Sequence, residues 1–327
     1  MQINQKFWEC LSPVLSELKQ KINCDFVVFG STPLYLLGVL DFERIENLND
    51  IDIAVGDDFV SSEEMQEVYF HDEPNQKLYK ILIQGINVDI GPAWPGREDI
   101  YDKIFRDSFE VGGFKFASLN TVREWKELMV KEYGREKDRN HLEKIKDFQK
   151  RKAESVIVAD ATLEDMENVL SLKDEVWVST YTNKEHGITV EDIQSRKIHN
   201  AQRLDFMQKS VRGKSTTEHI WTAKKGGRIV GMCWVERKDG YNKIGSLYLL
   251  PSYQRMGIGK RLMEKALSWL GEEKKIKLGV ATYNSDAIEF YRKFGFEFLC
   301  KGEDYVFPNG KKMPILQMVK YFEVKKQ

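Results

Sequence analysis

The stretch LYLLPSYQRMGIGKRLMEKALSWL, residues 247–270, joins an apolar run to an amphipathic pattern through a turn that contains Gly257 and Gly259. It predicts a strand that ends, and a helix that begins, within a few residues. Backbone N–H groups at such a point lack intrahelical acceptors, and the helix dipole adds positive potential, so the turn suits an anion. Glycine lets a pyrophosphate approach the amides because no Cβ intervenes. Taken alone, a tight turn before a helix explains the same residues.

The chain is long for a single hydrophobic core. It has 327 residues, whereas a typical domain has roughly 100 to 200. A change from the basic KRKAES to the apolar VIVAD lies near residue 154. We therefore predict two domains, residues 1–153 and 154–327, each an α/β or α+β arrangement of a mixed sheet with helices.

The charge balance limits the classes of partner. Fifty Lys and Arg stand against 51 Asp and Glu, which lacks the basic excess of a protein that holds nucleic acid through phosphates. No apolar run approaches the roughly 18 residues of a membrane span, and the start of the sequence has no signal-peptide pattern. The 4 cysteines form no C-x-x-C motif, so free thiols are expected. We expect a cytoplasmic protein with small-molecule partners.

The order of elements follows from hydrophobic periodicity. For the first half we expect a helix over 7–21, the strand DFVVFG, a buried helix in STPLYLLGVL, the strand DIDIAV, a hairpin in KLYKILIQGINVDIG that turns at Gln84 and Gly85, and two helices over 121–152 that Gly134 separates. For the second half we expect the strand VIVAD, a helix capped by Thr162 and Asp165, a further helical stretch with Trp177 and Tyr181, strands in HIWTAKKGGRIVGMCWVER, KIGSLYLL and KKIKLGVAT, a helix after the glycine turn, and a last helix in SDAIEFYRKFGF.

Two of these stretches, LYLLPSYQRMGIGKRLMEKAL and NSDAIEFYRKFGF, together resemble the GNAT acetyltransferase superfamily, over about residues 156–297. Gln254, Gly257 and Gly259 match the family pattern Q/R-x-x-G-x-G/A. The resemblance implies that backbone amides hold the pyrophosphate of coenzyme A, those of Arg255, Met256, Gly257, Ile258, Gly259 and Lys260. It also implies that the backbone of Leu249 and Leu250 pairs with the pantetheine arm.

The same resemblance implies roles near the reacting thioester. Asn284 matches a family asparagine near the cofactor, and Tyr291 matches a tyrosine beside the sulfur. A thiolate of pKa about 8.5 must leave when an amine attacks, and a phenol of pKa about 10 can protonate it as general acid. Packing of Tyr291 beside Phe290 and Phe294 is the alternative.

Two further roles stay open on sequence alone. A base or a water relay must remove the amine proton, and Glu236 is a weak candidate base, because a glutamate at a strand end is more often simply exposed to solvent. Trp177 and Tyr181 lie in the helical region that covers the acceptor in this superfamily. They either line the acceptor pocket or pack in the core.

The first half contains a different candidate site. In NDIDIAV, Asp50 and Asp52 project from one face of a strand, while Ile51, Ile53 and Val55 face the other way. Paired carboxylates suit Mg²⁺, and Asp89 on a second predicted strand can reach the same point. A solvated strand edge is the alternative.

These aspartates, with Gly30 and Ser31 between a strand and a helix, resemble the nucleotidyltransferase superfamily that has a polymerase-β-like fold, over about residues 25–91. The resemblance implies that Gly30 and Ser31 hold a nucleoside triphosphate and that Asp50, Asp52 and Asp89 bind Mg²⁺. Asp89 would also help to activate the acceptor hydroxyl. Lys137 either contacts phosphate or is an exposed helix lysine.

We therefore expect a bifunctional fusion of a nucleotidyltransferase-like domain with a GNAT N-acetyltransferase domain that uses acetyl-CoA. The acceptor is an amine of a small molecule, for which aminoglycosides that offer both hydroxyl and amine are an analogy, or of a protein. The alternative for the first domain is a catalytically inactive module that senses a nucleotide or docks the acetyltransferase to its target.

Overall fold

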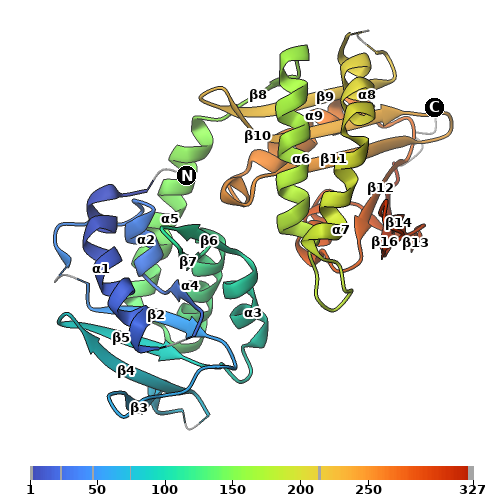
Figure 1. The fold of residues 1–327 in the computed structure, drawn as a ribbon. Coiled ribbons are helices and arrows are strands. Elements are labelled where there is room, and N and C mark those ends of the chain that lie inside the picture. Colours follow the sequence, from blue (N-terminus) through green and yellow to red (C-terminus); the bar gives the residue numbers. More distant parts are fainter. Residues whose placement is uncertain (1–2, 23, 46–47, 74, 213–214, 323–327) are drawn as a thin grey trace. The chain divides into compact units, whose positions relative to one another are not determined.

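The computed structural model describes residues 3–22, 24–45, 48–73, 75–212 and 215–322, and the chain divides into two units, 1–149 and 150–327 (Figure 1). The sequence places the boundary between residues 153 and 154. The structure divides the chain slightly earlier, after residue 149. This point lies within helix α5 (Glu136–Glu154), which continues across the division.

The sheet of the first unit has the strand order β3-β4-β5-β2-β1-β7-β6. Its strands are β1 (Phe26–Phe29), β2 (Asp50–Val55), β3 (Gln66–Tyr69), β4 (Lys77–Ile83), β5 (Ile86–Gly91), β6 (Ser108–Val111) and β7 (Phe114–Ala117). The hairpin β4–β5 turns at Gln84 and Gly85, which both have positive φ, as the sequence predicts. β2 pairs antiparallel with β1 and parallel with β5, so the sheet is mixed.

Helices cover this sheet on both faces. They are α1 (Gln5–Lys21), α2 (Thr32–Leu36), α3 (Glu98–Arg106), α4 (Leu119–Tyr133) and α5, with a 3₁₀ turn at Phe70–Asp72. Ile51, Ile53 and Val55 pack in one core with α1, whereas Ala54 packs in a second core with α4. Because side chains alternate along a strand, Asp50 and Asp52 share the face of Ala54. The predicted separation of aspartates from isoleucines is confirmed.

The sheet of the second unit has the order β13-β16-β12-β11-β10-β9-β8. Its strands are β8 (Ile157–Asp160), β9 (Glu218–Lys225), β10 (Arg228–Arg237), β11 (Asn242–Leu249), β12 (Ile276–Ala281), β13 (Glu297–Lys301) and β16 (Ile315–Lys320), and β14 (Tyr305–Val306) pairs with β15 (Lys312–Met313) apart from it. The helices are α6 (Met166–Tyr181), α7 (Val190–Gln194), α8 (Asn200–Arg212), α9 (Ile258–Leu270) and α10 (Ser285–Lys293), with 3₁₀ turns at Leu163–Asp165, Ser195–His199 and Pro251–Tyr253.

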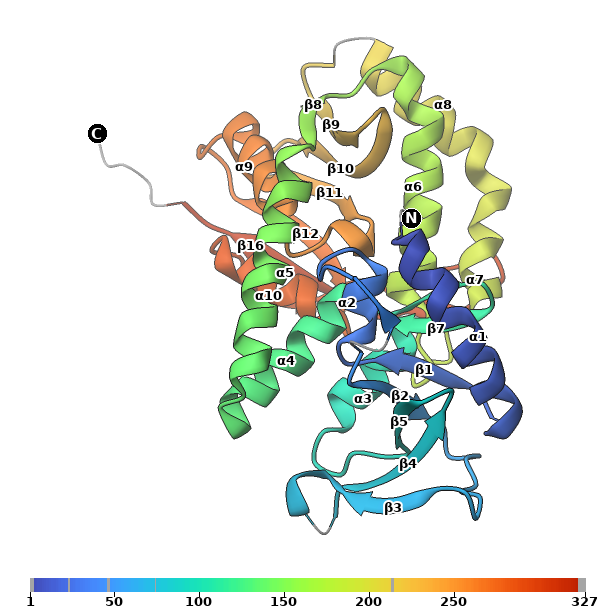
Figure 2. The same cartoon turned by 90° about the vertical axis from the view of Figure 1, so that its left-hand side faces the viewer.

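β11 and β12 separate soon after they meet. They are parallel, and within the described residues their paired positions are Asn242 with Ile276 and Lys243 with Lys277. Beyond these positions β11 remains paired with β10 as far as Leu249. α6 and α8 lie on one side of this sheet and α9 and α10 on the other (Figure 2). The sheet is therefore open between β11 and β12 at the end from which the chain runs into α9.

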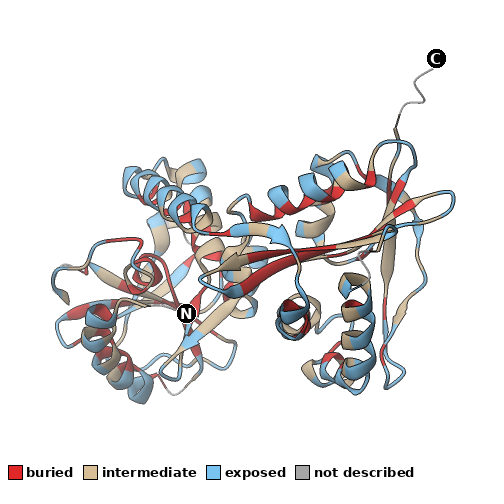
Figure 3. Cartoon of the chain, turned by 90° about the horizontal axis from the view of Figure 1, so that it is seen from above, coloured by how far each residue is buried: buried red, intermediate tan, exposed pale blue. Residues whose placement is uncertain are grey.

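In both units the buried residues follow the strands and the helix faces that turn toward them (Figure 3). Two expectations need correction. The helix expected in STPLYLLGVL is only the five residues of α2, because the chain turns at Gly38, whose φ is +71°. The two stretches expected after Thr162 form one helix, α6, and the predicted capping box of Thr162 and Asp165 lies on the 3₁₀ turn Leu163–Asp165 that leads into it. No helix in the described parts of the chain is long and apolar enough to cross a membrane.

Gly134 separates α4 from α5, as the sequence predicts, and the structure gives it a left-handed backbone with φ +63°. We expect Gly134→Ala to lower the free energy of unfolding of the first unit by about 1 kcal/mol, because a Cβ disfavours this conformation. Gly134→Asn is the matched control and should lose less, because asparagine tolerates positive φ. Calorimetric unfolding of the full chain measures both, and equal stability of Gly134→Ala and the unchanged chain would contradict this account.

Candidate functional site

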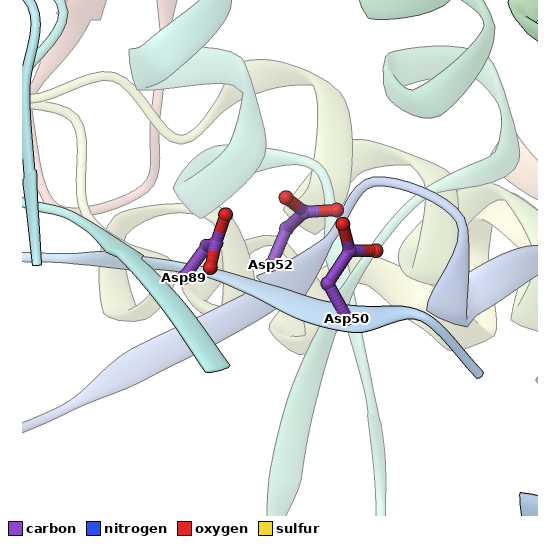
Figure 4. Close-up of side chains that lie close together, drawn as sticks. All are labelled: Asp50, Asp52 and Asp89. Atoms are coloured by element: carbon purple, nitrogen blue, oxygen red, sulfur yellow. The ribbon is translucent and has the colours of Figure 1, made fainter. Parts of the chain in front are cut away.

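Three carboxylates meet on one face of the first sheet. Asp50 and Asp52 lie on β2, and Asp89 lies on β5 directly opposite Asp52 in the parallel register. One oxygen of each lies within 4.8 Å of the others, and Figure 4 shows the three side chains projecting to the same side of the two strands. The prediction that Asp89 reaches the point where Asp50 and Asp52 converge is confirmed as geometry.

The carboxylates are crowded and poorly compensated. Burial, and then the charges of Asp50 and Asp89, raise the pKa of Asp52 to about 7. Burial also raises the pKa of Asp89, against the opposing effect of Lys80, whose Nζ lies 3.2 Å from Asp89 Oδ2. Asp89 Oδ1 is buried and has no hydrogen-bond partner among the described residues. A set of oxygen donors in this state fits a hard divalent cation such as Mg²⁺.

Gly30 allows one of these carboxylates to approach the backbone. Its φ is +68°, and a Cβ there would stand 1.8 Å from Oδ2 of Asp52. Neither the conformation nor the space admits another residue. The following Ser31 is buried, and its Oγ accepts a hydrogen bond from Lys126 Nζ at 3.3 Å. The helix dipole adds little to the phosphate-binding turn expected here, because α2 is short.

Sequence reasoning missed a buried ionic group beside this turn. Lys126 on α4 is 2% exposed, and its Nζ lies 2.8 Å from Oδ1 of Asp138 on α5. Arg135 Nε lies 2.9 Å from the other oxygen of Asp138. Burial lowers the pKa of Lys126, and Asp138 and Asp52 oppose that shift. The sequence signal for this group is the position of Lys126, which lies between Val122 and Met129 on the apolar face of α4.

The carboxylates and this ionic group line a single cavity in the first unit. Its lining includes Gly30, Ser31, Asp50, Asp52, Asp89, Trp94, Arg97, Trp125, Lys126, Arg135, Lys137 and Asp138. Lys137 is exposed on α5 but borders this cavity, so both alternatives offered for it by the sequence remain. Trp94 and Trp125 stack at a centroid distance of 4.4 Å. The lining of the cavity thus combines carboxylates, basic side chains and a stacked pair of tryptophans.

The second unit contains the predicted glycine turn. The chain leaves β11 at Leu249, passes the 3₁₀ turn Pro251–Tyr253 and enters α9 at Ile258. Gly257 caps α9 with φ +76°, and nothing lies within 4 Å of the place a Cβ would take. At Gly259, by contrast, a Cβ would stand 3.2 Å from Leu249 Cδ1. The first glycine therefore keeps the approach to the turn open, and the second lets the helix pack against the strand.

Side chains hold this turn in place. Gln254 donates from Nε2 to the carbonyl oxygen of Leu249 at 3.4 Å, and Arg255, which has a positive φ of 59°, forms an ion pair of 2.6 Å with Asp286 on α10. Ile258 is fully buried and Met256 packs against the same core. Lys260 is exposed and lies 3.7 Å from Glu264. The amides of residues 255–260 thus belong to an anchored turn at the positive end of a helix.

Leu249 and Leu250 lie beside the opening of the sheet. Leu249 pairs with Gly231 of β10, and the amide of Leu250 donates to the carbonyl oxygen of Val230 at 3.0 Å. In the described chain β12 pairs with β11 only at the strand's first two residues. The side of Leu249 away from β10 is therefore without a strand neighbour, which is the condition for an extended ligand to pair there.

Tyr291 on α10 is 8% exposed and belongs to the main core of the second unit. Burial raises its pKa, with smaller contributions from Tyr248 and Cys233. Its ring contacts those of Phe290 and Phe296. Phe294, the neighbour expected from sequence, contacts Phe290 instead. Tyr291 is thus both a core residue and a protonated phenol close to Tyr248, and both expectations for it remain.

Asn284 and Glu236 have structural partners of their own. Asn284 Oδ1 accepts a hydrogen bond from the amide of Ala287 at 3.2 Å and so caps α10. Glu236 lies near the end of β10 that is remote from Gly231, with its carboxylate 3.2 Å from Lys238 Nζ. Five residues along a strand span roughly 16 Å. Glu236 therefore lies near the strand end, as the alternative has it, but its side chain is half-buried rather than exposed.

Trp177 and Tyr181 occupy a small second core of this unit. Trp177 contacts the rings of Tyr181 and Tyr305 at centroid distances of 4.7 and 5.0 Å. The side chain of Tyr181 is in hydrogen-bond contact with Tyr248 on β11, and burial raises its pKa. Tyr248, which sequence reasoning did not single out, therefore connects this core to Tyr291.

Comparison with known proteins identifies the class of the second unit. Residues 188–296 match the model of the acetyltransferase (GNAT) family. The match includes the turn, the opening between β11 and β12, and Tyr291. The C-terminal half therefore contains a GNAT acetyltransferase domain, and the first unit lies outside the matched residues.

Several solved structures are similar to part of this chain. One is a PaiA N-acetyltransferase from Thermoplasma acidophilum in complex with coenzyme A, with 22% identity, a TM-score of 0.43, and coverage of 51% of this chain and 99% of that one. A ribosomal-protein-alanine N-acetyltransferase from Brucella melitensis has 19% identity, a TM-score of 0.38, and coverage of 51% and 99%. A putative streptothricin acetyltransferase from Bacillus anthracis, in complex with acetyl coenzyme A, has 24% identity, a TM-score of 0.29, and coverage of 33% and 64%. At these scores the structures add no weight to the family match.

The crowding of carboxylates predicts that Asp52→Asn stabilises the metal-free protein. Between pH 4 and pH 7 the unfolded chain ionises this carboxyl while the folded one keeps its proton, so the unchanged chain loses stability as pH rises. We expect a gain of about 1 to 3 kcal/mol at pH 8, less than the roughly 4 kcal/mol that a pKa change from 3.8 to about 7 corresponds to, because the side chain keeps some contact with water. Calorimetry with EDTA at pH 5 and 8 measures it.

The gain should be smaller at pH 5 than at pH 8. Asp41→Asn, at an exposed aspartate of the same unit, is the control and should change stability little at either pH. A loss of stability in Asp52→Asn, or a gain that does not grow with pH, would refute the crowding.

Proposed function

We propose that the second unit transfers the acetyl group of acetyl-CoA to an amine. The observation that carries this proposal is the turn from Gln254 to Lys260. It leads from an open-edged strand into a 13-residue helix, and the position of a Cβ on Gly257 is open. Amides of this turn and the helix dipole supply a site for the pyrophosphate of coenzyme A. The backbone of Leu249 and Leu250, beside the opening of the sheet, supplies the edge for the pantetheine arm.

In the reaction the neutral amine nitrogen attacks the thioester carbonyl, the C–S bond breaks, the departing thiolate takes a proton, and the nitrogen loses a proton to water, from which the donor is reprotonated. Tyr291 is the proposed donor, and its raised pKa keeps it protonated at neutral pH. The same burial favours the protonated form of a thiol. Cys233, buried in the same core, shows this effect, because burial raises its pKa to about 12. Burial therefore raises the pKa of the phenol and that of the leaving thiol in the same direction, so the phenol can still protonate the thiolate.

This proposal predicts that Gly257→Glu weakens acetyl-CoA binding at least about tenfold, because a carboxylate at the open face of the turn repels the pyrophosphate. The matched control is Gly240→Glu, which adds the same charge to another positive-φ glycine with open space around it. Isothermal titration with acetyl-CoA measures both variants. Unchanged affinity in Gly257→Glu would exclude the turn as the pyrophosphate site.

We further propose that the first unit binds Mg²⁺ and a nucleoside triphosphate and transfers the nucleotidyl group to a hydroxyl of a small molecule. The observation that favours this is the meeting of three carboxylates around an unpartnered buried oxygen of Asp89. Asp50, Asp52 and Asp89 would hold the metal, which supplies charge for the triphosphate and for the developing alkoxide. The Gly30–Ser31 turn and the basic walls of the cavity would face the phosphates.

The combined variant Asp50→Asn with Asp52→Asn is expected to abolish Mg²⁺-dependent nucleotide binding, because neutral amides cannot replace two anionic ligands. Thermal shifts with ATP, GTP and CTP, each with and without Mg²⁺, measure this, and Asp41→Asn should behave as the unchanged chain. Equal nucleotide binding by the double variant would remove the metal role.

Turnover separates an enzyme from a sensing module. Pyrophosphate release from a bound triphosphate in the presence of a hydroxyl acceptor supports transfer, whereas Mg²⁺-dependent binding without release supports the sensing or docking alternative for the first unit.

A further inference from the structure

A cluster of cations lies beside the proposed acetyl-transfer centre. Lys173 comes from α6, Arg196 from the 3₁₀ turn Ser195–His199, and Arg203 from α8. Their charges act on one another, since the two arginines lower the pKa of Lys173 and Arg203 lowers that of Arg196, in each case after the larger effect of burial. Within the described residues Asp174 is the carboxylate that pairs with this cluster, 3.1 Å from Arg203. In the described part of the chain, Lys173 and Arg196 have no ion pair with a carboxylate.

Both arginines have N–H donors without a hydrogen-bond partner among the described residues. Arg196 is 5% exposed, lies 3.3 Å above the ring of Trp177 and donates from Nε to the hydroxyl of Tyr305 at 3.2 Å. Its Nη1 is buried and has no hydrogen-bond partner in the described chain, and the same is true of Nη2 of Arg203. A buried donor without a hydrogen-bond partner lowers stability, and more so when it is charged. The contacts with Trp177 and Tyr305 fix the guanidinium of Arg196 without satisfying it.

The cluster is connected to the reacting end of the cofactor site. Lys173 Nζ lies 6.0 Å from the ring centroid of Tyr248 on β11. Tyr248 is in hydrogen-bond contact with Tyr181 and acts electrostatically on Tyr291. It also precedes Leu249, the strand residue at the opening of the sheet. Tyr248 also acts electrostatically on Arg196, so it lies between these cations and Tyr291. An acceptor whose amine is near Tyr291 would extend past Tyr248 toward Lys173 and Arg196.

We infer that Lys173 and Arg196, supported by Arg203, form an anion subsite, so that the acceptor carries a carboxylate or phosphate group in addition to its amine. The inference rests on the proposed acetyl transfer and narrows its substrate class. A guanidinium held by ring stacking with a free donor suits planar carboxylate or phosphate oxygens. It disfavours the polycationic, aminoglycoside-like acceptor considered from sequence, because three local cations repel such a molecule.

The first test measures binding without chemistry. The full chain is saturated with coenzyme A and titrated calorimetrically with succinate, inorganic phosphate and, as a cation, putrescine. We expect at least one anion to bind and putrescine not to bind. Lys173→Met and Arg196→Met should each weaken that anion about tenfold or more. Arg228→Met, at a half-exposed arginine on β10 of the same unit, should leave it unchanged.

The second test compares acceptors that share one amine. β-Alanine is paired with β-alaninamide, and phosphoethanolamine with ethanolamine, and the release of coenzyme A from acetyl-CoA is followed. The anionic member should have the higher kcat/KM in at least one pair, which also distinguishes carboxylate from phosphate. In Arg196→Met the preference should disappear through a raised KM, while the affinity for acetyl-CoA stays as in the unchanged chain.

Failure has defined forms. The inference is overturned if neither anion binds the unchanged chain, or if anion binding is the same in Lys173→Met and Arg196→Met, which would place it elsewhere in the molecule. It is also overturned if the neutral amine is the equal or better acceptor in both pairs. If none of these acceptors is acetylated, the calorimetric titration with the anions alone tests the inference. Acetyl-CoA binding that is normal in the chain and lost in Gly257→Glu would leave the proposed acetyl transfer intact.

Discussion

Both candidate sites depend on a glycine with a left-handed backbone at the point where a strand leads toward a helix. At Gly30 the conformation brings the chain so close to Asp52 that a Cβ would meet its carboxylate at 1.8 Å. At Gly257 the same kind of conformation leaves open space. One glycine thus places a charged group against the backbone, and the other keeps the backbone accessible to a charged group from solution. In each case the lack of a side chain allows a geometry that other residues disfavour.

Both units hold like charges at a density that folding alone does not favour. Three carboxylates line the first cavity, and in the second unit Lys173, Arg196 and Arg203 act electrostatically on one another, with Arg196 over the ring of Trp177 and Lys173 near that of Tyr248. In each cluster one ion pair gives partial compensation, from Lys80 to Asp89 and from Asp174 to Arg203, and buried polar atoms stay without partners. Such arrangements lower stability, and they are where a bound ion of opposite charge gains most. The sign differs, so the two units are suited to opposite ligands.

Much of the site geometry could be predicted because short-range patterns set it. The alternation DIDIAV already assigns the aspartates to one face of β2, and the run from LYLL to GIGK already implies a strand, a turn and a helix. The predictions failed where local sequence does not report its surroundings. Lys126 gives no sign in its own neighbourhood, beyond its place on an apolar face, that Asp138 lies 2.8 Å away. The contact of Tyr291 with Phe296 rather than Phe294 likewise depends on how α10 rests on the sheet.

The sequence by itself determined the periodicities and the glycine turns at the ends of strands and helices, because these depend on residues within a few positions of one another. Only the tertiary structure decided which distant residues meet. The parallel pairing of β2 with β5 brings Asp89 opposite Asp52, and the packing of α6 against β11 brings Lys173 near Tyr248. Such contacts depend on strand order and helix packing, which no single stretch of sequence contains.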